Sequence, residues 1–404
     1  MRVVFERCAG LDVHKKTVVA CLLTPEGKEV RTFGTMTQEL LALADWLEAQ
    51  GATHVAMESA GVFWKPVYNL LEELDLTVLL VNARHMKAVP GRKTDVKDAE
   101  WIADLLKHGL LKASFVPDRP QRELRELIRY RRTLIEQRSQ VVNRLQKVLE
   151  GANSKLASVA SNIVGASGLA MLEALTGGED DPEVLADLAK GTLKAKRTEL
   201  AQALQGVVGP HQRLLIASAL RHLNFLDGEI FCLDEEVNAR LTPFADELAR
   251  LATIPGVGRR TAEVVVAEIG LDMTRFPTAG HLASWARVCP GNNESGGKRK
   301  GGSAGQGNRW LRAALVEAAW AASHTKNTYL ASQYHRLAAR RGGKRAALAV
   351  AHSILVIIYH LLQRGTTYED LGGNYFDERN KQVAIHRSVR RIEQLGYRVT
   401  LEAA

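Results

Sequence analysis

The stretch VVFERCAGLDVHKKTVVACLLTPEGKEVRTFGT, residues 3–35, decides the fold of the N-terminal part of this chain. Its β-branched and apolar runs predict strands over about 3–12, 17–24 and 29–35, with only short gaps between them. Strands joined so closely pair antiparallel, because a parallel pair needs a crossover of about a dozen residues or more. The stretch therefore predicts a meander at the start of a sheet.

Helical patterns interrupt the later strands and predict a sheet that helices cover. Apolar spacing typical of helices occurs at about 37–50, 63–74 and 94–107, and strand-like runs occur at 53–59 and 76–83. Alternating strands and helices indicate an α/β domain. A meander followed by strand–helix units predicts an RNase H-like fold.

Four carboxylates occur in a fixed order in this region: Asp12 and Glu58 close strand-like runs, and Asp95 and Asp98 begin a predicted helix. An acid at the end of a strand points out of the sheet edge, and residues three apart on a helix are neighbours. Clustered carboxylates repel each other unless a cation neutralises them, and hard divalent cations prefer oxygen ligands. The pattern predicts a site for two Mg²⁺ ions, an arrangement that serves phosphoryl transfer.

Each acid also has a purely structural interpretation. Asp95 and Asp98 would complement the helix dipole behind an N-cap at Thr94, and Glu58 would be a turn residue. His14, two residues beyond the first acid, would either contact a phosphate or cap the strand. The order of all four acids and their strand-end placement favour the metal site.

The composition limits the class of protein. With 404 residues, 46% hydrophobic and 25% charged, the chain reads as a soluble globular protein of two or three domains. It has no run of about 18 apolar residues and no signal-peptide cleavage pattern, so we expect a cytoplasmic protein without a membrane partner. The cysteines lack C-x-x-C spacing, which argues against a zinc site or a disulfide framework; they are Cys8, Cys21, Cys232 and Cys289.

The net charge of +9 is unevenly distributed. Nine Lys and Arg against three Glu lie between Arg119 and Lys147. Five basic residues against one acid lie between Gly291 and Arg312. Such clusters favour a polyanionic partner, most simply nucleic acid.

A long helix is predicted over residues 119–150 by apolar pairs that recur every seven residues. Two interpretations stay open: the helix packs inside its own chain, or it forms a coiled coil with another chain. Residues 151–245 are rich in Ala and Leu and predict several helices that connect this arm to the rest. The apolar pairs are Leu127-Ile128, Leu134-Ile135, Val141-Val142 and Val148-Leu149.

The sequence IPGVG at 254–258 predicts a helix-hairpin-helix. Gly256 and Gly258 would let the turn approach a phosphate backbone, and Arg259 and Arg260 would add charge at the start of the next helix. Such a motif binds nucleic acid without reading its sequence. The alternative is an ordinary end of one helix and start of another.

The stretch CPGNNESGGKRKGGS, residues 289–303, is called the serine loop below. It has almost no apolar side chains to bury, so any function lies on its surface. Ser295 is a candidate nucleophile for a phosphodiester, with Ser303 an equally exposed competitor on spacing alone. Lys298, Arg299 and Lys300 would stabilise the charge of the phosphorane. Further on, residues 345–363 predict a buried apolar helix, and the tail from Gly365 is polar and basic.

These blocks together resemble the insertion-sequence-110-type transposases, also called DEDD transposases or recombinases, over nearly the whole chain. Their order is far more specific than any one block. The resemblance rests on GLDVHKKTV (10–18), MESAG (57–61), KTDVKDAEWIADLL (93–106), IPGVG (254–258) and PGNNESGGKRKGGSAGQGNRWLR (290–312).

The resemblance implies a Holliday-junction-resolvase-type RNase H-like domain whose DEDD acids fall on Asp12, Glu58, Asp95 and Asp98. It also implies a coiled-coil arm and a C-terminal domain whose nucleophile falls on Ser295. Members of this family are expected to recombine DNA through serine-linked intermediates and to assemble as dimers or tetramers. Some are expected to use a structured guide RNA from the element.

We therefore expect a DNA transposase of a prokaryotic insertion element, nucleoid-associated in the cytoplasm, that uses Mg²⁺. The first alternative is a structure-selective nuclease in which water replaces the serine, and the second is a non-catalytic nucleic-acid-binding scaffold. The expected domains are a catalytic domain at 1–115, an arm and connector at 116–245, a hairpin and serine-loop domain at 246–335 and a C-terminal helix and tail at 336–404.

Overall fold

The computed structural model divides into two compact units, Met1–Arg119 and Pro120–Ala404. Each unit is described by itself. The structure describes residues 2–59, 61–82, 95–289, 294–295, 298–299 and 307–402.

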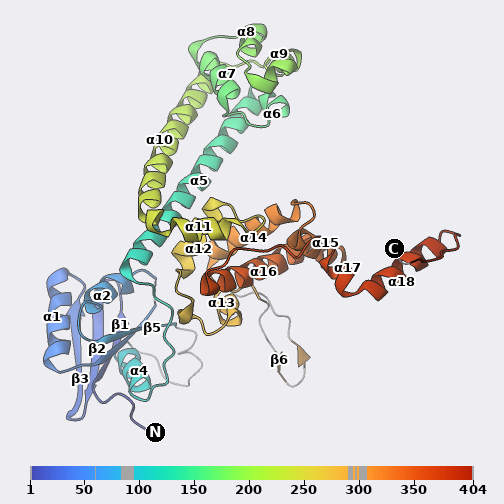
Figure 1. The fold of residues 1–404 in the computed structure, drawn as a ribbon. Coiled ribbons are helices and arrows are strands. Elements are labelled where there is room, and N and C mark those ends of the chain that lie inside the picture. The colour runs from blue at the N-terminus through green and yellow to red at the C-terminus, as the bar shows by residue number, and fades with distance from the viewer. Residues whose placement is uncertain are drawn as a thin grey trace. The chain divides into compact units, whose positions relative to one another are not determined.

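A mixed sheet of five strands forms the centre of the first unit, in the order β3-β2-β1-β4-β5 (Figure 1). The first three strands pair antiparallel, and β4 and β5 are parallel to β1. The predicted meander is therefore confirmed, and the sheet is compatible with an RNase H-like domain. The strands are β1 (Cys8–Val13), β2 (Thr17–Thr24), β3 (Gly27–Gly34), β4 (His54–Glu58) and β5 (Thr77–Val81).

The first strand begins five residues later than predicted. Val3 and Val4 are exposed, so their β-branched side chains contribute nothing to the sheet core. The backbone amides of Val4 and Phe5 instead donate to the carbonyl of Lys107. The N-terminal segment is therefore tied to a helix rather than to a neighbouring strand.

Helices cover both faces of the sheet. Alternate apolar residues of the strands pack with α1 (Thr37–Ala49) and α2 (Trp64–Leu71) on one face. The other face packs against α4 (Asp95–Lys107), whose small residues allow it to lie close to the sheet. The predicted alternation of strands and helices is confirmed within a few residues at each boundary.

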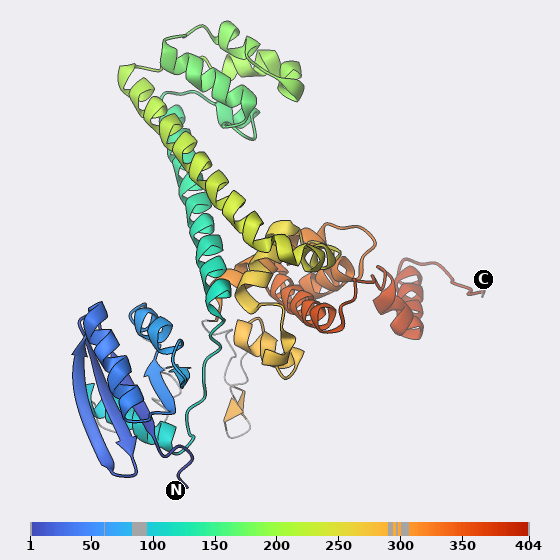
Figure 2. The same ribbon diagram turned by 60° about the vertical axis from the view of Figure 1, so that its left-hand side comes forward.

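The second unit contains a helical arm, formed by α5 (Arg119–Gly151) and α10 (Pro210–Leu241), which lie side by side in Figures 1 and 2. One cluster joins apolar residues of α10 and the arm tip with heptad residues of α5 that lie between Leu134 and Leu149. The seam is therefore filled from within the chain. The tip contains α6 (Leu156–Val159), α7 (Ala166–Gly177), α8 (Pro182–Asp187), the 3₁₀ turn η1 (Gly191–Lys196) and α9 (Arg197–Ala203).

Ion pairs hold the two arm helices in register. Arg131 pairs with Asp234, and Arg138 pairs with Asp227 two turns further along α5. Hydrogen bonding to Asp227 raises the pKa of Arg138. The ion pairs of the arginines between the heptad pairs thus support the interpretation in which this helix packs inside its own chain.

The rest of the second unit is helical. A short hairpin of β6 (Glu294–Ser295) and β7 (Lys298–Arg299) lies in the serine loop. The helices and 3₁₀ turns are η2 (Thr242–Phe244), α11 (Ala245–Ala252), α12 (Arg259–Ile269), η3 (Met273–Arg275), α13 (Ala279–Ala286), α14 (Arg309–Ser323), α15 (Tyr329–Arg341), α16 (Gly343–Arg364), α17 (Tyr375–Arg379) and α18 (Lys381–Glu393).

The apolar helix predicted at 345–363 is α16. Within the described residues it alone is long and apolar enough to cross a membrane, and half of its most apolar stretch is buried inside the protein. It packs against α13, α14 and α15. This is the behaviour of a core helix, as predicted.

Candidate active site

Asp12 and Glu58 occupy adjacent positions at one edge of the sheet. The parallel strands β1 and β4 pair Leu11 with Met57, so the next residue on each strand is one of the two acids. Paired residues on parallel strands point to the same face, and neighbouring strands lie about 4.8 Å apart. The two carboxylates therefore leave the sheet side by side.

The helix α4 runs against the direction of β1 along that face. The Phe5 amide donates to the Lys107 carbonyl at the last residue of α4, over 3.2 Å. Gly10, further along β1, faces the carbonyl of Ala99. Continued in this direction, the first turn of α4 reaches the end of β1 that carries Asp12.

Asp95 and Asp98 occupy this first turn. Asp98 precedes the buried Ile102 by four residues and Asp95 precedes the buried Ala99 by four, so both positions lie on the sheet-facing side of α4. The backbone thus places the four predicted acid positions at the same end of the sheet. Among the described residues no three acidic, histidine or cysteine side chains form a group that could hold a metal ion, and the Asp95 side chain lies outside that description.

Gly10 sets the distance between α4 and the sheet. A Cβ atom at this position would lie 2.3 Å from the amide nitrogen of Ala103 and 2.4 Å from the carbonyl oxygen of Ala99. Only glycine lets the helix backbone approach so closely. The residue two positions before the first acid therefore allows the first turn of α4 to lie close to that acid.

Asp12 is nearly buried, with 9% of its surface exposed. Its Oδ2 atom lies 3.0 Å from Nε2 of His14, whose ring remains about half exposed. The backbone of His14 closes the β1–β2 turn, because its amide donates to the Thr17 carbonyl. The contact of the His14 ring with the strand-end acid is a third role, which neither interpretation of this residue included, and a contact with phosphate remains a prediction.

The predicted hairpin is present, but its residues have internal partners. Gly256 has φ = +85°, and a Cβ there would lie 2.2 Å from the Ala318 carbonyl of α14, so this glycine serves packing within the chain. Gly258 is the N-cap of α12, and nothing lies within 4 Å of the space a Cβ would fill. An approach to a phosphate through this turn remains a prediction.

Arg259 and Arg260 both bind the buried Glu263 one turn later on α12, over 3.1 and 2.9 Å. Arg260 also pairs with Asp234 of α10, and Arg259 donates to Asn238. These arginines therefore tie the hairpin to the base of the arm. Their predicted role toward nucleic acid is untested.

The structure describes five residues of the serine loop: Cys289, Glu294, Ser295, Lys298 and Arg299. Ser295 on β6 pairs with Lys298 on β7, and Glu294 pairs with Arg299, so the short hairpin places the candidate nucleophile directly across from a lysine. Lys300 and Ser303 lie outside the described residues.

Most of the arginines in the basic cluster between Arg119 and Lys147 form ion pairs with acids of the same chain. Arg125 and Arg129 bind Glu268, and Arg132 binds Glu317 of α14. Together with the arm ion pairs, this leaves much less free positive charge on α5 than the sequence indicated. The physical reason is that the acids which neutralise α5 lie far away in the sequence.

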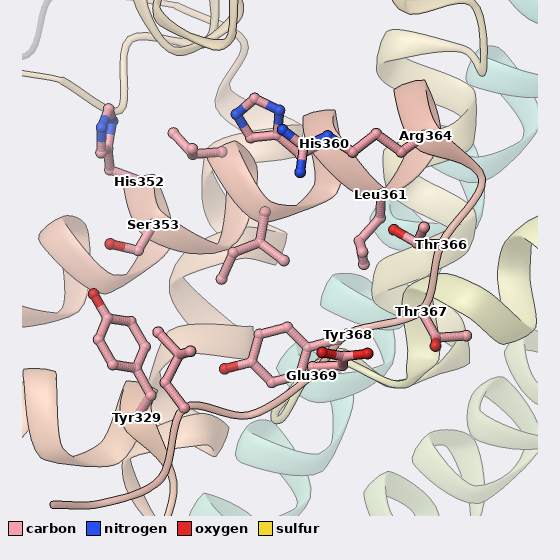
Figure 3. A pocket seen from close by; sticks show the side chains of 13 residues that line it. Tyr329, His352, Ser353, His360, Leu361, Arg364, Thr366, Thr367, Tyr368 and Glu369 are labelled. Atoms are coloured by element: carbon pink, nitrogen blue, oxygen red, sulfur yellow. The ribbon is translucent and has the colours of Figure 1, made fainter. Parts of the chain in front are cut away.

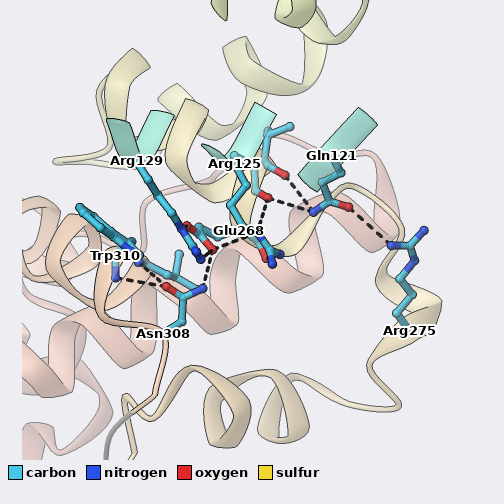
Figure 4. Close-up of polar contacts among 10 residues, drawn as sticks. Gln121, Arg125, Arg129, Glu268, Arg275, Asn308 and Trp310 are labelled. Carbon is cyan, nitrogen blue, oxygen red and sulfur yellow. Dashed lines mark hydrogen bonds and ion pairs between the residues drawn. The ribbon is translucent and has the colours of Figure 1, made fainter. Parts of the chain in front are cut away.

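A buried polar network joins α5, α12 and the start of α14, and the sequence analysis missed it (Figure 4). The Glu268 side chain is 1% exposed. Its carboxylate accepts two hydrogen bonds of 2.7 Å from Arg129 and one of 2.6 Å from Asn308. Burial lowers the pKa of Arg125 to about 10, and Glu268 opposes this shift. A lone acid inside the apolar run VVVAEIG was the available signal.

A separate pocket of about 610 Å³ lies between α16 and residues 366–371 (Figure 3). The Nδ1 atoms of His352 and His360 in its lining are buried and make no hydrogen bond with any described residue. Burial lowers the pKa of His352 and raises that of Tyr368, whose hydroxyl donates to Asp370. None of the predicted site residues lines this pocket.

Comparison with protein families decides the identity of the chain. A family model described as a transposase of the DEDD, IS110 type matches residues 9–154, which include all four acids. A second model, described as the transposase IS116/IS110/IS902 family, matches residues 248–336, which include the hairpin and the serine loop. The chain belongs to the IS110 transposase family. It is thus a transposase of an insertion element, one of the enzymes that cut and rejoin DNA.

Two relatives of this IS110-family transposase are similar along most of their length, and a third is similar over a shorter segment. A 43.6 kDa protein of insertion element IS110 from Streptomyces coelicolor is 28% identical over 393 residues, covering 89% of this chain and 95% of the relative. The transposase of IS1111A from Coxiella burnetii is 25% identical over 366 residues, covering 89% and 90%. A pilin gene-inverting protein of Moraxella bovis is 30% identical over 122 residues, covering 30% and 38%.

Proposed function

We propose that this transposase cuts and rejoins DNA with Ser295 as nucleophile, assisted by Mg²⁺ at Asp12, Glu58, Asp95 and Asp98. The observation that most supports the proposal is the backbone placement of the four acid positions at one end of the sheet. The alternative is a nuclease of the junction-resolvase type in which water is the attacking group.

The donor chemistry of the acid cluster fits a hard divalent cation. All four groups offer carboxylate oxygens, and Asp12 is nearly buried beside the position of Glu58. Two acids held together at low exposure repel each other, and a cation removes that repulsion. Bound Mg²⁺ would supply charge stabilisation to a reacting phosphodiester.

The proposed serine step conserves the number of phosphodiester bonds. The Ser295 hydroxyl loses its proton, Oγ forms a bond to phosphorus, and one P–O bond of the DNA breaks to leave a free DNA hydroxyl. Attack of a hydroxyl from another DNA end on the phosphoserine reverses these changes and reseals the strand. Lys298 and Arg299 on β7 would balance the charge of the pentavalent phosphorus, as would Lys300.

The turn between α15 and α16 is a further candidate for contact with DNA. Residues 318–368 contain no Asp or Glu. Four of the exposed cations in this stretch lie at the turn itself: Arg340 and Arg341 end α15, and Lys344 and Arg345 lie in the first turn of α16. The described part of the chain gives none of the four an ion pair. Phosphates are the most direct counter-charge for such a turn.

The family resemblance supports two further proposals about partners. The first is a structured guide RNA from the element that pairs with donor and target DNA. The second is assembly as a homodimer or tetramer that brings the serine of one protomer to the acids of another.

A denaturing gel tests the proposal. We expect that protein incubated with the element's junction DNA and Mg²⁺ forms a covalent adduct that survives denaturation. The band should disappear in Ser295→Ala and persist in Ser303→Ala, the matched control from the same loop. Strand cleavage without an adduct in the parent protein would favour the nuclease.

A further inference from the structure

Glu268 connects three segments that are far apart in the sequence. It lies in the last turn of the helix α12, and its carboxylate binds Arg129 of α5 and Asn308 at the start of α14. Arg125 adds hydrogen bonds of 3.2 and 2.6 Å to the carbonyls of Ala267 and Glu268, which satisfy the end of α12 (Figure 4). The carboxylate is therefore held rigidly from both sides.

Asn308 uses both ends of its amide. Its Oδ1 atom accepts hydrogen bonds of 3.1 and 3.0 Å from the amides of Trp310 and Leu311, which caps α14. Its Nδ2 atom donates to Glu268 over 2.6 Å. A simple cap needs only the oxygen, so the second contact fixes the cap relative to α12 and α5.

The chain segments before and after the serine loop meet beside this network. A Cβ at Gly307 would lie 2.4 Å from Cγ of Arg287, so these two residues, twenty positions apart, touch. Arg287 ends α13 in the left-handed conformation, with φ = +55°. The next residue after Gly307 is Asn308. The bridge from Asn308 to Glu268 therefore fixes the point at which the chain leaves the loop.

Stability alone is a weak explanation for this bridge. Buried ion pairs often contribute no more to stability than apolar residues of the same volume. Their best-supported use is to fix one geometry among several. A nucleophile needs this kind of fixation, because a displacement of about 1 Å costs roughly 10²-fold in rate.

We infer that Glu268 and Asn308 are positioning residues for the serine chemistry: their hydrogen bond sets the base of the serine loop against the arm and α12. This inference rests on the proposed function, in which Ser295 is the nucleophile. Neither residue is proposed to touch the reacting atoms.

Asn308→Ser tests the bridge apart from the cap, because serine still caps a helix but cannot reach Glu268. We expect the rate of adduct formation at saturating DNA to fall on the order of 10²-fold, with DNA affinity and melting temperature nearly unchanged. Thr328→Ser is the matched control, because Thr328 caps α15 and has no contact with Glu268. In a second arm, Asn308→Asp keeps the capping oxygen but replaces the group that donates to Glu268 with an acceptor, so it should slow adduct formation at least as much as Asn308→Ser.

Hydrogen exchange separates this inference from the proposed function. In Asn308→Ser we expect faster exchange of the amides from Gly307 to Arg309, with exchange elsewhere unchanged. Absence of any adduct in the parent protein would sink the proposed serine chemistry, and the exchange data would still judge the bridge. An adduct rate and an exchange pattern in Asn308→Ser that both equal those of the parent would overturn the inference, as would an unchanged adduct rate in Asn308→Asp.

Discussion

The Nε2 atom of His14 lies 3.0 Å from Oδ2 of Asp12, on the strand end where the predicted metal ligands converge. An imidazole that holds a carboxylate in place fixes the direction in which its other lone pairs point. Partners of this kind tune metal affinity by about 10–100-fold when they are removed.

We expect Asp12→Asn to abolish recombination and His14→Ala to raise the Mg²⁺ concentration for half-maximal activity by about 10–100-fold. The reason is that Asp12→Asn removes the negative charge of the carboxylate, whereas His14→Ala removes only the imidazole that holds this carboxylate in place. Activity titrated with Mg²⁺ measures both. Asp45→Asn, on the exposed face of α1, is the control that should behave like the parent. Full activity of Asp12→Asn would rule out the acid cluster.

Gly10→Ala is expected to destabilise the first unit by at least about 1–3 kcal/mol, because the new methyl group overlaps the backbone of α4. Local hydrogen exchange of α4 measures the loss without assuming two-state unfolding of the whole chain. Gly228→Ala in the middle of α10 has free space and is expected to stabilise the arm by about 0.5–1 kcal/mol. Equal effects at both glycines would contradict the close helix–sheet contact.

The stability of the arm should depend on the apolar contacts between α5 and α10. Leu223→Ala empties a buried position of α10 and is expected to cost about 2–5 kcal/mol of arm stability. Phe225→Ala, on the exposed side of the same helix, should change arm stability by no more than about 0.5 kcal/mol. Proteolysis of the arm under native conditions distinguishes the two. A larger loss at Phe225 would place the energetically important contacts outside the chain.

Salt dependence tests the α15–α16 turn. Replacing Lys344 and Arg345 with Gln should weaken DNA binding and reduce the slope of log affinity against log salt by about 0.9 for each phosphate that the variant no longer neutralises. Lys194→Gln with Lys196→Gln, exposed at the arm tip, is the control for loss of two charges. An unchanged slope in the Lys344/Arg345 variant would exclude the turn from the interface.

The buried thiols predict a loss of stability at high pH. Burial raises the pKa of Cys8 and Cys21 to about 11 in the folded protein. An unfolded thiol has a pKa near 8.5, so only the unfolded state loses the proton between these values. Stability of the first unit should therefore fall as pH rises from about 9 to 11, and this contribution should shrink in Cys8→Ala. Thiol reagents at pH 8 should modify the exposed Cys232 well before either buried cysteine.

Most of the first unit could be predicted from the sequence because its signals are local. The meander, the later strands and α4 follow from runs of apolar residues, and the acids stand at the ends of those runs. The strand predicted at residues 3–5 was wrong, because β-branched residues indicate a strand but do not provide the neighbouring strand with which it must pair. The predicted extension of β1 through these residues is replaced by a contact of Val4 and Phe5 with Lys107.

The charges could not be predicted in the same way. The positive charge of α5 looked like a nucleic-acid surface because its partners, such as Asp227, Asp234 and Glu268, lie about a hundred residues away or more. Ion pairing between distant segments leaves no periodic trace in the sequence. The register of β1 and β4, which sets Asp12 beside Glu58, is likewise a property of the assembled sheet.

The arm has one more consequence. Its two helices leave from and return to the same base, where Asp234 binds both Arg131 and Arg260. Insertion of one heptad into α5 and its counterpart into α10 would move the tip outward by about 10 Å without altering that base. An arm built in this way can therefore change its length by whole helical turns, and such a change leaves the sequence of the residues proposed for chemistry unaltered.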